Sequence, residues 1–204
     1  MSASATNTRS TLASGSRPTR GSRRLACGLL SALLSSAWLS GCTTLPDNAV
    51  QERLDERTGT TVTALQRALE LVSTAPRRGQ SDPFAYLAPF ETNRMGTRQM
   101  YLWVAVPNES RNVTAPQVEL DGTPLSLRSL GPDPQTIGLA AFPYATPAPW
   151  SSVTLLALDA PALQTLAAAA TLEISVSYDA QPVRFTGTPQ PAGILTQFLQ
   201  SLGL

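Results

Sequence analysis

The stretch TLEISVSYD, from Thr171 to Asp179, decides the fold class of this chain. Apolar and polar residues alternate along it without a break, and its apolar side consists of Leu172, Ile174, Val176 and Tyr178. Successive side chains of a β-strand point to opposite faces, so this period of two predicts a strand with one face buried and the other in water. Half-buried strands of this kind are typical of antiparallel sheets.

A second stretch, RQMYLWVAV from Arg98 to Val106, is apolar on both of its faces. Such a strand is expected in the middle of a sheet, with a covering layer on each side. The segment Asn93–Thr97 before it predicts a tight turn in which Gly96 takes a positive φ. Phe84–Glu91 is then its antiparallel partner.

The same pattern of short strands and turns continues through the rest of the chain. Val118–Leu120 and Leu125–Leu127, on either side of Asp121–Pro124, predict a hairpin. Further strands are predicted at Thr60–Leu65, Ala68–Ser73, Val153–Leu158 and Pro182–Gly187. Prolines gather between Gly131 and Trp150, and this segment is expected outside the strands because proline cannot donate to a ladder.

Two short helices are predicted. Asp159 can cap a helix that begins near Pro161 and continues to Ala170. Pro191–Leu202 carries an apolar stripe at helical spacing, which favours docking on the sheet over contact with a membrane. The chain is therefore predicted to be mainly β: an immunoglobulin-like antiparallel β-sandwich with one or two short helices and the C-terminal helix docked on the sheet. A small barrel is the alternative.

Composition excludes several classes of chemistry. The 204 residues include 15 basic and 14 acidic ones, but no histidine and no lysine, and the only cysteines are Cys27 and Cys42. Ser-His-Asp and Cys-His catalysis, lysine Schiff bases and zinc sites of Cys and His are therefore excluded. The residues after Cys42 include ten arginines and fourteen carboxylates. This acidic, lysine-free region argues against nucleic-acid binding.

The first 42 residues have the features of an export signal. Five arginines and no acid precede a run of 15 uncharged, mostly apolar residues, Leu25–Leu39, and small residues follow it. A basic start, a short apolar run and a small-residue exit are typical of a secretory signal. The run is shorter than the roughly 20 residues that a membrane-spanning helix needs.

Leu39-Ser40-Gly41-Cys42 resembles the lipobox of bacterial lipoproteins. The resemblance implies that a signal peptidase recognises Leu39, Ser40 and Gly41 and cleaves before Cys42, whose thiol carries a diacylglyceryl group. Thr43, in place of the aspartate that retains such proteins in the inner membrane, implies the periplasmic face of the outer membrane. We therefore expect a cleaved signal peptide at 1–41, a lipidated flexible tether at 42–57, and one β-sandwich domain at 58–204.

Few residues are candidates for a functional site. The carboxylates on or beside predicted strands are Glu91, Glu119, Asp121, Asp133 and Glu173, and a close pair of them could cleave glycosides. Isolated acids more often lie in turns or on the solvated surface, and we expect no metal site and no cofactor. Arg94 and Arg98 in the predicted turn, and Trp150 in the proline-rich segment, are possible partner contacts. An apolar pocket lined by Phe90, Tyr101 and Trp103 is a further alternative, although aromatics on central strands usually belong to the core.

From Glu52 to about Pro107 the chain resembles a group of uncharacterised proteobacterial outer-membrane lipoproteins. The matching features are ERLD-x-x-TG-x-TVT at Glu52–Thr63 and N-R-M-G followed by Y-L-W at Asn93–Trp103. The resemblance assigns no catalytic residue. We expect a non-enzymatic binding or structural module, anchored by the lipid on Cys42, whose partner is an envelope protein or glycan. The alternatives are a carboxylate-dependent hydrolase of envelope glycans and a carrier of an apolar ligand.

Overall fold

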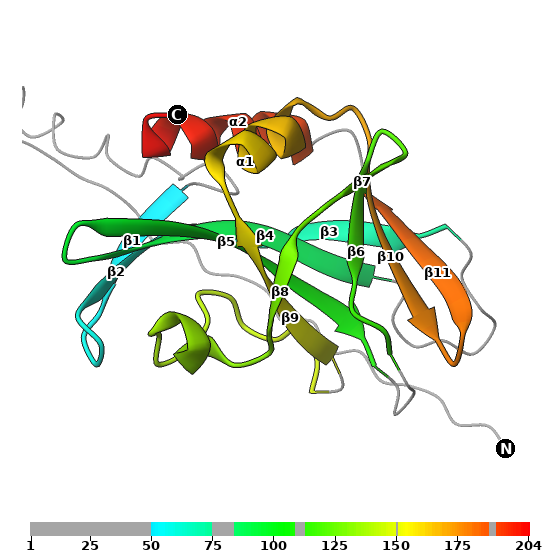
Figure 1. Cartoon of the computed structure of the whole chain (residues 1–204), viewed down its shortest axis with the longest axis horizontal. Helices are drawn as coiled ribbons and strands as arrows, with labels where there is room; N and C mark the ends of the chain where they lie inside the picture. Colours follow the sequence, from blue (N-terminus) through cyan, green and yellow to red (C-terminus); the bar gives the residue numbers. More distant parts are fainter. Residues whose placement is uncertain (1–49, 75–83, 109–112, 150, 188–190) are drawn as a thin grey trace, which may run out of the picture. The chain divides into compact units, whose positions relative to one another are not determined.

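The computed structural model describes residues 50–74, 84–108, 113–149, 151–187 and 191–204. This part of the chain is mainly β, with an antiparallel curled sheet and two α-helices, one of them C-terminal (Figure 1). The strands are β1 (Val50–Asp55), β2 (Thr60–Leu65), β3 (Leu69–Ser73), β4 (Phe84–Arg94), β5 (Thr97–Pro107), β6 (Gln117–Leu120), β7 (Thr123–Leu125), β8 (Arg128–Gly131), β9 (Ser151–Leu158), β10 (Leu172–Tyr178) and β11 (Gln181–Gly187). The helices are the 3₁₀-helix η1 (Pro134–Ile137), α1 (Ala160–Ala168) and α2 (Pro191–Leu202). The predicted mainly β, antiparallel, sandwich-like fold is confirmed.

All the described strands belong to one hydrogen-bonded sheet, with nine of them on a single path. Its order is β7-β6-β10-β11-β3-β4-β5-β9-β8, with β2 pairing with β4 and β1 with β2 to form a branch. Although β7 and β8 lie at opposite ends of this path, only Ser126 and Leu127 separate them in the chain. The sheet must therefore curl until its two ends approach each other.

The sheet forks where β2 and β3 meet β4. Strand β2 pairs with the second half of β4, up to Ala64 opposite Phe90, and β3 pairs with the first half, from Leu69 opposite Leu87. Pro89 lies at this break in the pairing, and Tyr144 from the proline-rich segment bridges it. The Tyr144 hydroxyl accepts a hydrogen bond from the Leu65 N–H at 3.1 Å and donates one to the Pro89 carbonyl at 2.6 Å. Both backbone groups are thereby satisfied although the ladder is interrupted.

Strand β5 has covering layers on both sides, as its sequence predicted. In Figure 1, α1 and α2 lie on one side of the sheet, and the segment that contains η1 lies on the other. On the side of this segment, the Trp103 ring lies 5.4 Å from the Tyr144 ring, measured between centroids. The residues from Tyr101 to Pro107 are all buried. Trp103 and Phe90 are among the largest fully buried side chains of the described residues, and both belong to one hydrophobic core.

The helices begin and end close to where the sequence predicted. The Asp159 carboxylate accepts a hydrogen bond from the Ala162 N–H at 2.8 Å and so caps the N-terminus of α1. Helix α2 buries Leu195, Phe198 and Leu202 in the core and packs against α1. Docking of the C-terminal helix is confirmed. No helix among the described residues has the length and apolar character that crossing a membrane requires.

The predicted flexible tether at 42–57 is wrong in its second half. Val50–Asp55 forms strand β1, which pairs with β2 along its whole length, from Val50 opposite Leu65 to Asp55 opposite Thr60. Its four central side chains are exposed, so the strand has no apolar alternation to reveal it. Its hydrogen bonds come from the backbone, which carries no signal in the side-chain pattern. The folded domain therefore includes Val50, and the expected boundary at residue 58 is corrected.

Candidate functional site

The hairpin of β4 and β5 carries two of the predicted contact residues. Its turn is formed by Met95 and Gly96, with φ of 53° and 83°, which confirms the predicted positive φ at Gly96. The Met95 side chain is 99% exposed at the tip. Arg94 is also exposed, so this end of the hairpin presents a cation and a large apolar side chain to solvent.

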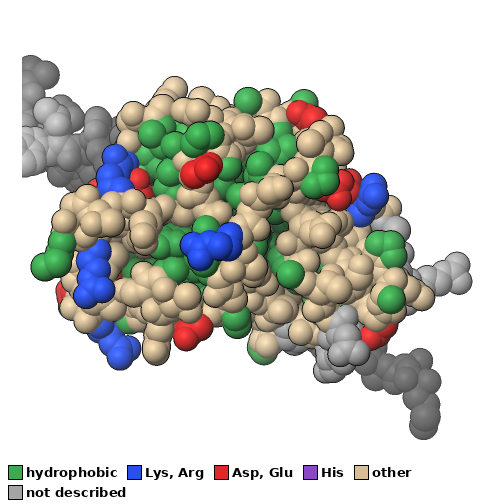
Figure 2. Space-filling view, in the orientation of Figure 1, with side chains coloured by type: hydrophobic (Ala, Val, Ile, Leu, Met, Phe, Trp, Pro, Cys, Tyr) green, Lys and Arg blue, Asp and Glu red, His purple; other side chains and the backbone are tan. Residues whose placement is uncertain are grey.

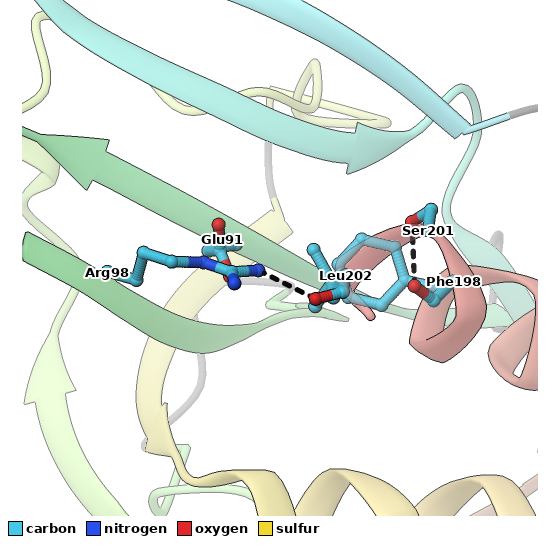
Figure 3. Close-up of polar contacts among 5 residues, drawn as sticks. All are labelled: Glu91, Arg98, Phe198, Ser201 and Leu202. Carbon is cyan, nitrogen blue, oxygen red and sulfur yellow. Dashed lines mark hydrogen bonds and ion pairs between the residues drawn. The ribbon is translucent and has the colours of Figure 1, made fainter. Parts of the chain in front are cut away.

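Arg98 makes internal contacts instead (Figure 3). Its Nη2 lies 2.7 Å from Oε2 of Glu91, and its Nε donates to the same oxygen at 2.9 Å. Nη2 also donates to the Leu202 carbonyl at the end of α2, at 3.0 Å. The hydrogen bond and negative charge of Glu91 raise the pKa of Arg98. Because a cation at the C-terminus of a helix is favourable, Arg98 serves to hold α2 against the hairpin.

Several predicted site residues lie outside the described residues. These are Leu39, Ser40, Gly41 and Cys42 of the lipobox, and Trp150. The predictions that concern them, peptidase recognition, lipidation and partner contact, stay predictions.

Most of the candidate carboxylates already have hydrogen-bond or ion-pair partners within the fold. Asp133 caps η1 by accepting from the Gln135 N–H at 2.9 Å, and Glu91 is buried against Arg98. Asp121 accepts from both the N–H and the hydroxyl of Thr171, at 2.8 and 3.0 Å. These bonds lower its pKa. Three of the five carboxylates therefore stabilise turns, a helix end or an ion pair.

The remaining two carboxylates are brought together by strand register. Glu119 on β6 lies directly opposite Glu173 on β10. The Ser175 hydroxyl donates to Oε1 of Glu119 at 3.2 Å, and Nε of Arg184 lies 3.3 Å from Oε1 of Glu173. Glu119, Ser175 and Arg184 line a polar hollow of about 540 Å³ on this face of the sheet. Among the described residues, no three His, Cys, Asp or Glu side chains cluster as metal ligands.

The three predicted pocket aromatics do not form a pocket together. Phe90 and Trp103 are fully buried, and the Phe90 ring lies 5.3 Å from that of Tyr101 within the core. Only Tyr101, which is 5% exposed, reaches a surface hollow. Burial raises the pKa of Tyr101, and its hydroxyl donates to Oε1 of Gln99 at 2.5 Å.

This hollow is a groove of about 560 Å³ between β5, β8, η1 and the junction of β9 and α1. Its polar lining includes Arg98, Gln99, Tyr101, Arg128 and Thr136, and its apolar lining includes Met100, Leu130, Ile137 and Leu158. Its size is that of a small-molecule site, and its lining combines apolar walls with a few polar groups. Sequence reasoning missed Arg128, the basic residue of the stretch LSLRSL from Leu125 to Leu130. Figure 2 shows apolar side chains between sparse charged ones on this side of the molecule.

The fold and the groove define a mainly β protein with a curled antiparallel sheet and a mixed polar and apolar surface site. No protein-family model matches the chain, and no curated protein shows significant similarity to it.

Proposed function

We propose that this chain is a lipid-anchored, non-enzymatic binding module of the bacterial cell envelope, held at the periplasmic face of the outer membrane. The observation that carries the anchoring is the sequence Leu39-Ser40-Gly41-Cys42, directly after an apolar run of 15 residues with a basic leader. In lipoproteins with such a sequence the cysteine thiol carries a diacylglyceryl group, and several acyl chains hold a protein far more firmly than one.

The start of the sheet supports a role at the membrane surface. Strand β1 begins at Val50, eight residues after Cys42. Eight extended residues reach at most about 30 Å, so a lipid on Cys42 would keep the domain within that distance of the bilayer. Val50 packs against the core, so the folded domain includes this residue.

The groove beside Arg128 supports the binding role. It is concave and combines apolar walls with polar groups that can orient a ligand. Its walls are built from strands and helix ends of the folded domain. A site on such elements is held more precisely than one on loops alone.

A second candidate, a carboxylate-dependent hydrolase of envelope glycans, is favoured by one observation. Glu119 and Glu173 lie opposite each other across β6 and β10, which is a spacing of about 5 Å between Cβ atoms for directly paired residues. Retaining glycosidases use carboxyl groups about 5 Å apart. If this candidate is right, Glu119→Gln and Glu173→Gln each abolish release of reducing sugar from envelope glycans.

The anchoring is tested by two cysteine variants. Cys42→Ser is expected to abolish labelling by an alkyne fatty acid and to move the protein out of the outer-membrane fraction. Cys27→Ser is the matched control, because Cys27 lies in the segment that we expect to be removed, and its labelling should equal that of the parent. Normal labelling of Cys42→Ser would overturn the proposal.

A further inference from the structure

Three residues on neighbouring strands line up across the groove. Tyr101 of β5 lies opposite Ala157 of β9, and Ala157 lies opposite Arg128 of β8. Directly opposed residues in an antiparallel sheet project from the same face. Neighbouring strands lie about 4.8 Å apart, so Tyr101 and Arg128 stand about 10 Å apart with Ala157 between them.

Ala157, the middle residue of the three, is small, and its size explains why the surface of the sheet has a hollow at this point. A methyl group fills little of the space between a tyrosine ring and an arginine side chain. Ala157 is partly exposed and, with Tyr101 and Arg128, belongs to the lining of the groove. Leu130 and Ile137 supply apolar walls at the β8 and η1 side. The hollow therefore has a methyl floor, an aromatic side, an aliphatic side and a cationic side.

Among the described residues, the positive charge of Arg128 has no carboxylate partner. Asp159 also lines the groove, but its carboxylate caps α1 through the Ala162 N–H. The charge of Arg98 is matched by Glu91. An anion in the groove would thus meet one guanidinium that no described carboxylate pairs with.

We propose that the groove over Ala157 binds a small anionic amphiphile, a molecule in which a carboxylate or phosphate is joined to an apolar chain or ring. The fork of N–H groups on Arg128 matches the oxygens of either anion. The apolar part would cover Ala157 between Tyr101, Leu130 and Ile137. This inference deepens the proposed binding role by naming the ligand class, and it does not depend on lipidation.

The test uses the full chain with Cys42→Ser, prepared without detergent, because a detergent would compete for an apolar groove. Decanoate and decyl phosphate are titrated by calorimetry. Decanol supplies the same chain without the charge, and acetate and inorganic phosphate supply the charge without the chain. We expect binding of the two anionic amphiphiles and at least tenfold weaker binding of the three partial probes.

Two variants change the groove in different ways. Arg128→Gln removes the charge and should weaken binding of decanoate and decyl phosphate about tenfold or more, the usual size of a charge-assisted hydrogen bond. Ala157→Leu keeps the charge and fills the hollow, and it should abolish binding. Arg57→Gln, an exposed arginine in the turn between β1 and β2, is the matched control and should bind as the parent does. Ala157→Val serves if the leucine variant does not fold.

Several results would overturn the proposal. One is equal affinity for decanoate in the parent, Arg128→Gln and Ala157→Leu. Another is decanol binding as tightly as decanoate, which would leave Arg128 without a role. Binding to phosphatidic-acid vesicles that needs Arg128, with no binding of free decyl phosphate, would assign the groove to a membrane surface and not to a free ligand. None of these results bears on acylation of Cys42, so the two proposals can fail separately.

Discussion

Strands β5 and β10 are both flanked by antiparallel partners, yet they lie in different environments. Every residue of β5 from Tyr101 to Pro107 is buried, whereas β10 alternates between buried and partly exposed positions along its length. Backbone pairing is therefore not what distinguishes them. What differs is the second face, which is buried along this part of β5 and partly exposed along β10. The comparison shows that the sequence of a strand records how many of its faces are covered.

The second layer over β5 depends on a segment without regular strands. Tyr144 connects this segment to the fork in the sheet by two hydrogen bonds, and its ring packs against Trp103 and Phe90. Leu139 from the same segment is also buried. The helices cover the other face. Strand β5 is thus held between two layers that come from distant parts of the chain.

The largest expected effect contrasts one residue from each strand. Trp103→Ala in β5 should lower the free energy of unfolding by about 3 to 5 kcal/mol, because it leaves a large cavity between two layers. Ser177→Ala on the open face of β10 should change it by no more than about 0.5 kcal/mol. Urea unfolding followed by circular dichroism measures both. Similar losses in the two variants would contradict the contrast.

The second prediction concerns the Tyr144 hydroxyl, whose two hydrogen bonds hold the second layer in place. Its expected effect on stability is smaller. Tyr144→Phe keeps the ring contacts but leaves the Leu65 N–H and the Pro89 carbonyl unpaired and buried. The free energy of unfolding should fall by about 1 to 3 kcal/mol. Tyr144→Ala, which also removes the ring, should cost more. If the phenylalanine variant were as stable as the parent in the same urea assay, the hydroxyl would have no part in closing the fork.

The smallest expected effect is on how stability depends on pH. One carboxylate beside each of the two regions contributes to it. Asp55 accepts from the Ala140 N–H at 2.8 Å beside the covered region, and Asp121 accepts from Thr171 beside the open one. These bonds lower the pKa of both carboxyls below the ordinary 3.8. Their contribution to stability is complete above that value and is lost as pH falls through the lowered pKa.

Asp55→Asn and Asp121→Asn should each flatten the decline of the urea midpoint between about pH 4 and about pH 2. Glu56→Gln, an exposed neighbour of Asp55, is the control and should leave the decline unchanged. A parent-like decline in both asparagine variants would mean that these hydrogen bonds do not stabilise the fold.

Sequence patterns predicted most of the regular structure, and the exceptions have physical causes. The alternation of β10, the two apolar faces of β5, the Asp159 cap and the C-terminal helix are local signals, and all are confirmed. Strand β1 was missed because its exposed side chains carry no periodicity. Arg98 was predicted as a possible partner contact, and its bond to Leu202 joins residues 104 positions apart in the chain. Its pairing with Glu91 depends on the register of the β4–β5 hairpin.

By itself, the sequence determined the fold class, the Asp159 cap and the candidate lipid-bearing thiol, because each depends on side chains close together in the chain. Only the tertiary structure decided that Tyr101, Ala157 and Arg128 share one row, since their alignment depends on the pairing register of three separate strands. The bridge that Tyr144 makes across the fork likewise joins residues far apart in the chain. Apolar residues that recur every two or every 3.6 positions show which face of a strand or helix is buried. They do not show which strand pairs with which.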